Sequence, residues 1–328
     1  MSARELNSTV DENVVMPRDG LLSDRCRCSV RSSILARCRI SSRFLILLVV
    51  VALSEGLTAQ EQTKNEMIGF RLRDGYLMIV QVMVNGAGPF SFLVDTGSTR
   101  SVLDPDLARQ LQAPTVGEVA VTTVLRYRRD KLVRLEDVRL GQASVSGLDA
   151  IVDKLTRQKS LAPGIRGILG EDFLSKFDIL IDYKKRSMVF GGPPPAGERC
   201  RFETIGQYHG APTTNRLLIG VEFVEVSGGK VQLQLDTGAK TPELFPVSHD
   251  SDPSRPWGGA MATSSGANGI VIHSNVALKI CTTTVPGLDV VQSRSAVAFD
   301  AVGLLPATVF HRIYISHSGG FLVLNPAE

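Results

Sequence analysis

Residues 92–103 read FLVDTGSTRSVL, and residues 233–244 read LQLDTGAKTPEL. Each stretch is an apolar strand that runs into Asp-Thr-Gly, at Asp95 in the first copy and at Asp236 in the second. A single Asp-Thr-Gly carries little information, because a chain of this length contains one by chance roughly one time in fifteen at average residue frequencies. Two copies at the ends of similar strands indicate an internal repeat.

The segments around the two acids repeat as well. In each half, an apolar segment, a turn and a second apolar segment lead into the Asp, which is typical of a β-hairpin. The paired segments are residues 76–84 with 90–94 and residues 217–226 with 231–235. A glycine followed by two aliphatic residues comes later in each half, and each half ends in a hairpin-like segment. These are residues 167–170 (GILG) and 177–190 in the first half, and residues 303–306 (GLLP) and 310–326 in the second.

Short β-branched runs between Gly, Asn and Pro turns predict a mostly β fold. One short helix is expected at residues 105–111, where Asp104 can cap the first turn and Pro105 suits the first helical position. The segment GGPPPAGE has the composition of a stiff, exposed connection. The expected parts are a leader at 1–59, a first lobe at 60–190, this linker at 191–198 and a second lobe at 199–328.

The leader has the pattern of a signal peptide. Six arginines and no acidic residue lie from Arg25 to Arg43, directly before the apolar residues 44–53 (FLILLVVVAL), and cleavage is expected after Ala59. A helix of that length spans only about 15 Å, half the hydrocarbon core, so export to the periplasm or the outside is predicted. A buried strand or a membrane anchor at residues 44–53 is the alternative. A start codon downstream of Met1 is also open.

Composition and motifs exclude several classes of protein. The net charge is +3, and no dense basic run is interleaved with aromatics, so no nucleic-acid partner is expected. No Cys/His cluster has the spacing of zinc ligands, so no metal is expected. Neither GxSxG nor HExxH occurs, which argues against a serine or metallopeptidase. The five histidines are interpreted as surface or capping residues.

Outside the leader, Cys200 and Cys281 are expected either to pair or to remain as two buried thiols.

The repeated motifs resemble those of the aspartic peptidases, and the repeat unit is more similar to the retropepsin type than to the larger pepsin lobes. The resemblance covers residues 66–328. It implies an all-β, bilobal fold of two retropepsin-like β-barrel lobes related by a pseudo-twofold axis. In that family an aliphatic strand braces each Asp-Thr-Gly turn. Here the bracing residues are Ile168, Leu169 and Gly170 in the first half and Leu304 and Leu305 in the second. Pro306 stands where a glycine is expected, so the second bracing strand could be distorted.

The resemblance makes Asp95 and Asp236 the expected catalytic residues. The other turn residues are Thr96, Gly97 and Ser98 in the first half and Thr237, Gly238 and Ala239 in the second. The Thr hydroxyl can bond backbone across the site, and Gly allows the backbone to turn tightly. Two carboxylates around one water cannot both ionise, so the pair is expected to share one proton. Ser98 is expected to hydrogen-bond Asp95, which would make Asp95 the base and Asp236 the acid.

Members of this family cover the site with a β-hairpin flap. In the second half the candidate tip contains Gly266, Asn268 and Gly269, and in the first half the candidate is residues 121–133, with Tyr127 expected to contact substrate. An ordinary solvated hairpin is the alternative for both segments.

The prediction for function is therefore an aspartic endopeptidase that hydrolyses peptide bonds through a water molecule activated between the two aspartates, without a cofactor. Its substrate is expected to be a peptide or a protein. Both acids come from one chain, so a monomer with an intramolecular site is expected. The alternative is a catalytically silent peptide-binding protein that keeps the fold and the cleft.

Overall fold

The structure, a computed structural model, describes residues 66–122, 127–155, 164–204, 207–208, 211–212, 216–224, 226–245, 270–293 and 303–325. All of these residues belong to one compact unit, Thr63–Glu328. Their regular structure is almost entirely β-strand, so the predicted all-β fold is confirmed. Within these residues no helix is long and apolar enough to span a bilayer. The expected leader, with its apolar run at residues 44–53, lies outside the described residues.

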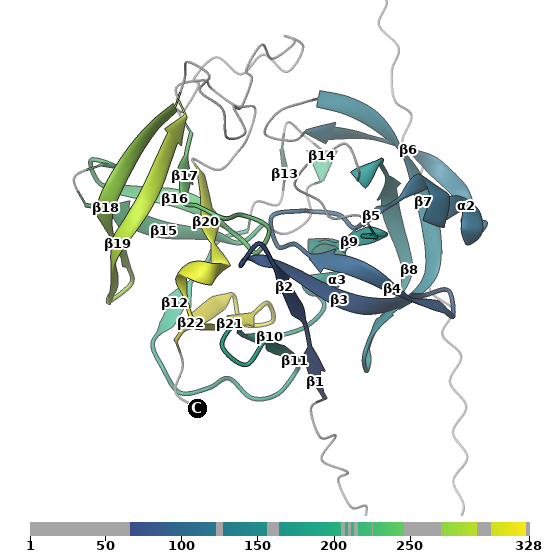
Figure 1. Ribbon diagram of the computed structural model, residues 1–328, viewed down its shortest axis with the longest axis horizontal. Coiled ribbons are helices and arrows are strands. Elements are labelled where there is room, and N and C mark those ends of the chain that lie inside the picture. Colours follow the sequence, from purple (N-terminus) through teal and green to yellow (C-terminus); the bar gives the residue numbers. More distant parts are fainter. Residues whose placement is uncertain are drawn as a thin grey trace, which may run out of the picture. The chain divides into compact units, whose positions relative to one another are not determined.

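The first half of the chain forms an eight-stranded sheet (Figure 1). Its strands are β2 (Arg71–Arg73), β3 (Leu77–Val84), β4 (Ala87–Val94), β5 (Val102–Leu103), β6 (Thr115–Thr122), β7 (Tyr127–Leu140), β8 (Ala143–Val152) and β9 (Gly167–Leu169). They lie in the order β2-β3-β4-β9-β5-β8-β7-β6, and β3 also pairs with β7 at Val84 and Val138. The second pairing closes the strands from β3 to β7 into a ring.

The second half forms a closed six-stranded barrel. Its strands are β15 (Leu218–Phe223), β16 (Lys230–Asp236), β17 (Glu243–Leu244), β18 (Ile270–Ile280), β19 (Thr283–Ser293) and β20 (Gly303–Pro306). They lie in the order β15-β16-β20-β17-β19-β18, with β18 paired back to β15.

The two strand orders are the same once equivalent strands are matched. The ring β3-β4-β9-β5-β8-β7 of the first half corresponds strand by strand to the barrel of the second half. The directions agree too, since β4 is parallel to β9 and β16 is parallel to β20. The repeat seen in the sequence is therefore a repeat of architecture.

A six-stranded sheet contains strands from both halves. It consists of β1 (Met67–Gly69), β10 (Ile179–Asp182), β11 (Ser187–Phe190), β12 (Arg199–Arg201), β21 (Arg312–Ser316) and β22 (Phe321–Leu324), in the order β1-β11-β10-β21-β22-β12. The halves meet where β10 and β21 pair antiparallel, with Leu180 opposite Tyr314. The predicted terminal hairpins are confirmed as β10–β11 and β21–β22, but their joining in one sheet was not predicted. A small hairpin, β13 (Gln207–Tyr208) with β14 (Ala211–Pro212), completes the strands.

Short helices follow some of the strands. The predicted helix is confirmed as α2 (Pro105–Gln110), in which the Asp104 carboxylate accepts a hydrogen bond from the Asp106 N–H at 2.9 Å. The others are α3 (Glu171–Leu174), directly after β9, and the 3₁₀ turn η2 (Ala307–Val309), directly after β20. Each therefore begins where a bracing strand ends.

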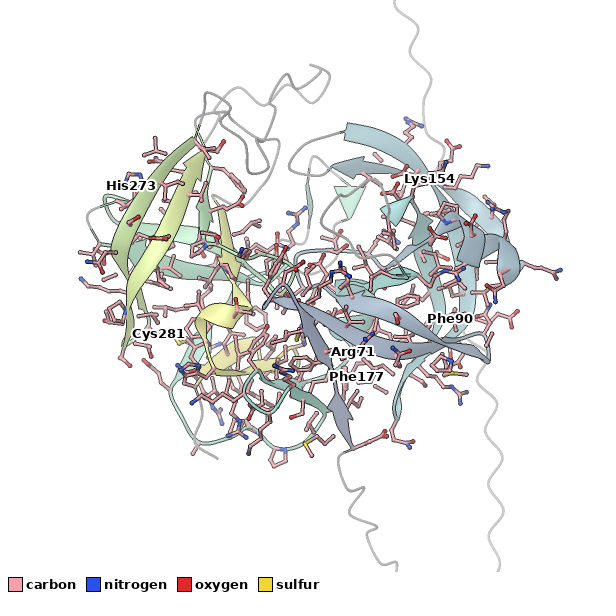
Figure 2. All side chains as sticks on the ribbon, viewed as in Figure 1. Arg71, Phe90, Lys154, Phe177, His273 and Cys281 are labelled. Carbon is pink, nitrogen blue, oxygen red and sulfur yellow. A yellow bond between two sulfur atoms is a disulfide. The ribbon has the colours of Figure 1, made fainter. Side chains whose placement is uncertain are left out.

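Cys200 and Cys281 form a disulfide, which decides between the two alternatives that the sequence left open. Their Cα atoms are 5.9 Å apart. Cys200 is buried in β12, and Cys281 lies in the exposed turn between β18 and β19 (Cys281 is labelled in Figure 2). The bond thus ties the barrel of the second half to the sheet that both halves share.

Candidate active site

The strands β4 and β16 end at the two acids. Asp95 follows Val94 directly, and its N–H donates to the carbonyl of Leu169 in β9 at 3.0 Å. Asp236 is the last residue of β16 and lies opposite Pro306 in β20. Each acid is therefore held against the aliphatic strand expected to brace it, and Ile168, Leu169, Leu304 and Leu305 all lie in those strands.

Four hydrogen bonds made by Thr96 and Thr237 join the two turns. The Thr96 N–H donates to the Thr237 hydroxyl oxygen at 3.0 Å, and the Thr237 N–H donates to the Thr96 hydroxyl oxygen at 3.1 Å. Each hydroxyl in turn donates to a carbonyl of the opposite half, Thr96 to Leu235 and Thr237 to Val94, both at 2.9 Å. Both threonines are almost fully buried. Buried hydrogen bonds of this kind fix the two turns against each other.

The two carboxyl groups lie together. The Gly97 N–H donates to Asp95 Oδ1 at 2.9 Å, and the Gly238 N–H donates to Asp236 Oδ1 at 2.6 Å. A hydrogen bond also joins the Asp95 side chain to the Asp236 side chain. The structure thus brings together the six residues of the two Asp-Thr-Gly turns.

The electrostatics of the pair fit one shared proton. Burial raises the pKa of Asp236 well above its ordinary value, and the charge of Asp95 raises it further. Burial also raises the pKa of Asp95, but the hydrogen bond from Asp236 and the N–H groups of Gly97 and Ser98 oppose that rise. These shifts favour Asp236 as the protonated member and Asp95 as the one more readily ionised.

The two turn glycines each lie close to the acid of the opposite half. A Cβ on Gly97 would lie 2.5 Å from the Asp236 carboxyl carbon, and one on Gly238 would lie 3.0 Å from Asp95 Oδ1. Neither glycine has a left-handed φ. The expectation that these residues serve a tight turn is therefore incomplete, because each also makes room for the acid of the opposite half.

The expected contact between the Ser98 hydroxyl and Asp95 is wrong. That hydroxyl donates to the carbonyl of Arg100 at 2.7 Å, and its single proton is used there. Ser98 stabilises the charge of Asp95 through its backbone N–H, as Ala239 does for Asp236. Ser98 and Ala239 therefore act on the two acids in the same way, although only Ser98 has a hydroxyl group.

Pro306 does not distort the second bracing strand. It pairs with Asp236 at the end of β20, which runs without interruption from Gly303. At the equivalent place in the first half, a Cβ on Gly170 would lie 2.6 Å from the backbone of Arg100. Only the first half is therefore packed tightly enough at this place to require glycine. Lys240, close behind the second turn, is exposed.

The flap candidates are only partly described. In the first half β6 and β7 form a hairpin with Thr122 opposite Tyr127, and the tip at residues 123–126 lies outside the described residues, as does the side chain of Tyr127. Gly266, Asn268 and Gly269 also lie outside them, directly before β18.

A buried ion pair near the site was not anticipated. His317 Nε2 lies 3.0 Å from Glu171 Oε2, and its Nδ1 lies 2.6 Å from the carbonyl oxygen of Phe177. The interpretation of every histidine as a surface or capping residue is thus wrong for His317, whose side chain is 4% exposed. Burial opposes its charged form, but the hydrogen bond and the charge of Glu171 outweigh burial and raise the pKa of His317. The pair ties α3 to the turn after β21.

Within the described residues, no three His, Cys, Asp or Glu side chains gather as a metal site would require.

Known proteins share part of this chain's sequence and fold. Residues 80–173 match the model of a family described as aspartyl protease, and this range contains Asp95 and the bracing strand β9. A solved structure of a retropepsin-like aspartic protease from Rickettsia conorii is similar over 39% of this chain and 90% of its own, with 19% identity and a TM-score of 0.29. No curated protein matches the chain. The family match supports placing the chain in the aspartic peptidase superfamily.

Proposed function

We propose that the protein is an aspartic endopeptidase whose two lobes each supply one catalytic carboxyl group, Asp95 and Asp236. The observation that carries this proposal is the reciprocal pairing of the turns. Each acid receives N–H groups from its own turn, each threonine bonds the opposite half, and the two carboxyl groups share a hydrogen bond.

The larger rise in pKa at Asp236 supports the complementary protonation that water activation needs. Asp95, as the ionised member, takes a proton from a water molecule, whose oxygen then attacks the carbonyl carbon of the peptide. Asp236, as the protonated member, donates its proton to the carbonyl oxygen. When the tetrahedral intermediate breaks down, Asp95 gives its proton to the leaving amide nitrogen, and Asp236 takes a proton back from a hydroxyl of the intermediate. The C–N bond breaks, and the pair returns to its starting state without a cofactor.

A catalytically silent peptide-binding protein is the second candidate, because a fold alone does not guarantee activity. The hydrogen-bonded pair of acids argues against it. A cleft that only bound peptides would gain nothing from two buried carboxyl groups, whose desolvation opposes folding at neutral pH.

The site is proposed to work within a monomer, since one chain supplies both acids. Export is proposed from the leader at residues 1–59. The disulfide between Cys200 and Cys281 agrees with an oxidising compartment.

The test is hydrolysis of a diverse peptide pool by the purified protein across a range of pH, with Asp95→Asn and Asp236→Asn beside it. New peptide termini should appear with the wild type and with neither variant. Binding of peptides without cleavage at any pH would favour the silent candidate, and normal cleavage by either variant would exclude the two-aspartate mechanism.

A further inference from the structure

The two halves differ in one pair of buried residues next to the candidate site. In the matching strand registers, Gln234 in β16 corresponds to Leu93 in β4, because Gln234 lies opposite Leu304 and Leu93 lies opposite Ile168. Arg216, which precedes β15, corresponds in the same way to Leu77 in β3. The first half therefore has two leucines in an apolar cluster where the second half has an arginine and a glutamine.

Gln234 is fully buried and crosses to the turn of the opposite half. Its Nε2 donates to the carbonyl of Gly97 at 3.0 Å and to the carbonyl of Thr96 at 3.3 Å. Behind it, the guanidinium of Arg216 donates to Gln234 Oε1 at 3.4 Å. A guanidinium only donates and a carbonyl only accepts, so both partners require the same orientation of the amide.

The two carbonyls that accept from Gln234 belong to the peptide groups that stabilise Asp95. The carbonyl of Thr96 shares its peptide group with the Gly97 N–H, which donates to Asp95 Oδ1 at 2.9 Å. The carbonyl of Gly97 shares its peptide group with the Ser98 N–H, which donates to the main-chain carbonyl of Asp95 at 3.2 Å and also stabilises the charge of the Asp95 carboxyl group. Hydrogen bonds in such a chain polarise one another, so a donor at the carbonyl strengthens the N–H at the other end.

We propose that Gln234, oriented by Arg216, is a positioning residue that makes Asp95 the base of the pair by strengthening the Gly97 and Ser98 N–H groups that stabilise its charge. Asp236 has no such support from the first half, because the side chain of Leu93 has no polar atom. The two Asp-Thr-Gly motifs themselves are alike. The difference between the two halves lies in the residues behind them, Gln234 and Arg216 in one half and Leu93 and Leu77 in the other. Only the predicted effect on the kcat/KM profile rests on the proposed function.

The test replaces Gln234 by Met, which has similar length and no hydrogen-bonding amide, with Leu93→Met as the matched control in the other half. Loss of support for the charged form raises the pKa of Asp95. The acidic limb of the kcat/KM profile should therefore move to higher pH by about half a unit to one unit in Gln234→Met, with the limb unchanged in Leu93→Met. Arg216→Met should move the limb in the same direction, and Arg216→Lys, which keeps the cation, should restore it.

A second readout does not need activity. Titration of the Asp95 carboxyl carbon by NMR in the intact protein should show the same upward shift in Gln234→Met. If the wild type cleaves no peptide, the proposed function fails, and this titration still decides the inference. A folded Gln234→Met with an unchanged titration of Asp95, or an equal shift in Leu93→Met, would overturn it. If Gln234→Met does not fold, the two Arg216 variants decide by the same criterion.

Discussion

Thr96 and Thr237 each donate a backbone N–H to the hydroxyl of the other, at 3.0 and 3.1 Å. Each hydroxyl also donates to a carbonyl across the site, so each of the two hydroxyl groups both accepts and donates a hydrogen bond. The strands β4 and β16, which end at the acids, are therefore held together by side chains that lie next to those acids in the sequence.

Thr96→Val should lower the free energy of unfolding by about 2 to 4 kcal/mol, because the variant leaves a buried carbonyl at Leu235 and a buried N–H at Thr237 without partners. Valine has the shape of threonine, so packing is kept. Urea denaturation measures the change. Thr115→Val, on the exposed surface of β6, serves as the control and should change stability by less than about 0.5 kcal/mol. An equal effect of the two substitutions would mean that the threonine bonds do not hold the turns.

Gly97→Ala should reduce kcat/KM by roughly 100-fold, since the added Cβ would displace the Asp236 carboxyl group from its place. Gly238→Ala should cost less, because its nearest contact, at 3.0 Å, leaves more room. Peptide hydrolysis under identical conditions measures both. Gly117→Ala, where a Cβ would meet nothing within 4 Å, is the control and should keep wild-type activity. The reverse order of the first two variants would contradict the close approach of each glycine to the opposite acid.

Asp236→Asn should make the protein more stable at pH 7 and leave its stability nearly unchanged near pH 3. The pKa of Asp236 is raised in the folded state, so the favourable contribution of its proton is fully present below the unfolded pKa and is lost as pH rises through the folded pKa. Asparagine is neutral at every pH and does not lose that contribution. Unfolding free energies at the two pH values provide the measurement, with Asp289→Asn, an exposed residue of β19, as the control for loss of formal charge. A variant less stable than the wild type at pH 7 would contradict the raised pKa.

Local features of the fold could be predicted because they depend on neighbours in the chain. The hairpin that ends at Asp95, its counterpart at Asp236 and the helix capped by Asp104 all follow from short patterns of apolar, turn and capping residues. The matching strand orders of the two halves follow from the repeat of those patterns.

Features that depend on contacts between the halves could not be predicted. The pairing of β10 with β21, the ion pair of Glu171 with His317 and the bond from Gln234 to Gly97 all join residues far apart in sequence.

The Ser98 hydroxyl was assigned wrongly because the carbonyl of Arg100 competes for its proton, and the sequence does not show which acceptor lies nearer. One signal was available for Gln234: a polar residue at a place where the first half has leucine.

The most direct test of the central claim is to mix the Asp95→Asn and Asp236→Asn variants and to measure peptide hydrolysis over a wide range of protein concentration. A site built from both turns of one chain predicts that each variant is inactive while folded, and that the mixture stays inactive at every concentration. It also predicts wild-type activity per molecule that does not fall on dilution. Recovery of activity in the mixture would show that Asp95 and Asp236 of different chains form the site, and normal hydrolysis by either variant alone would contradict the paired-aspartate account.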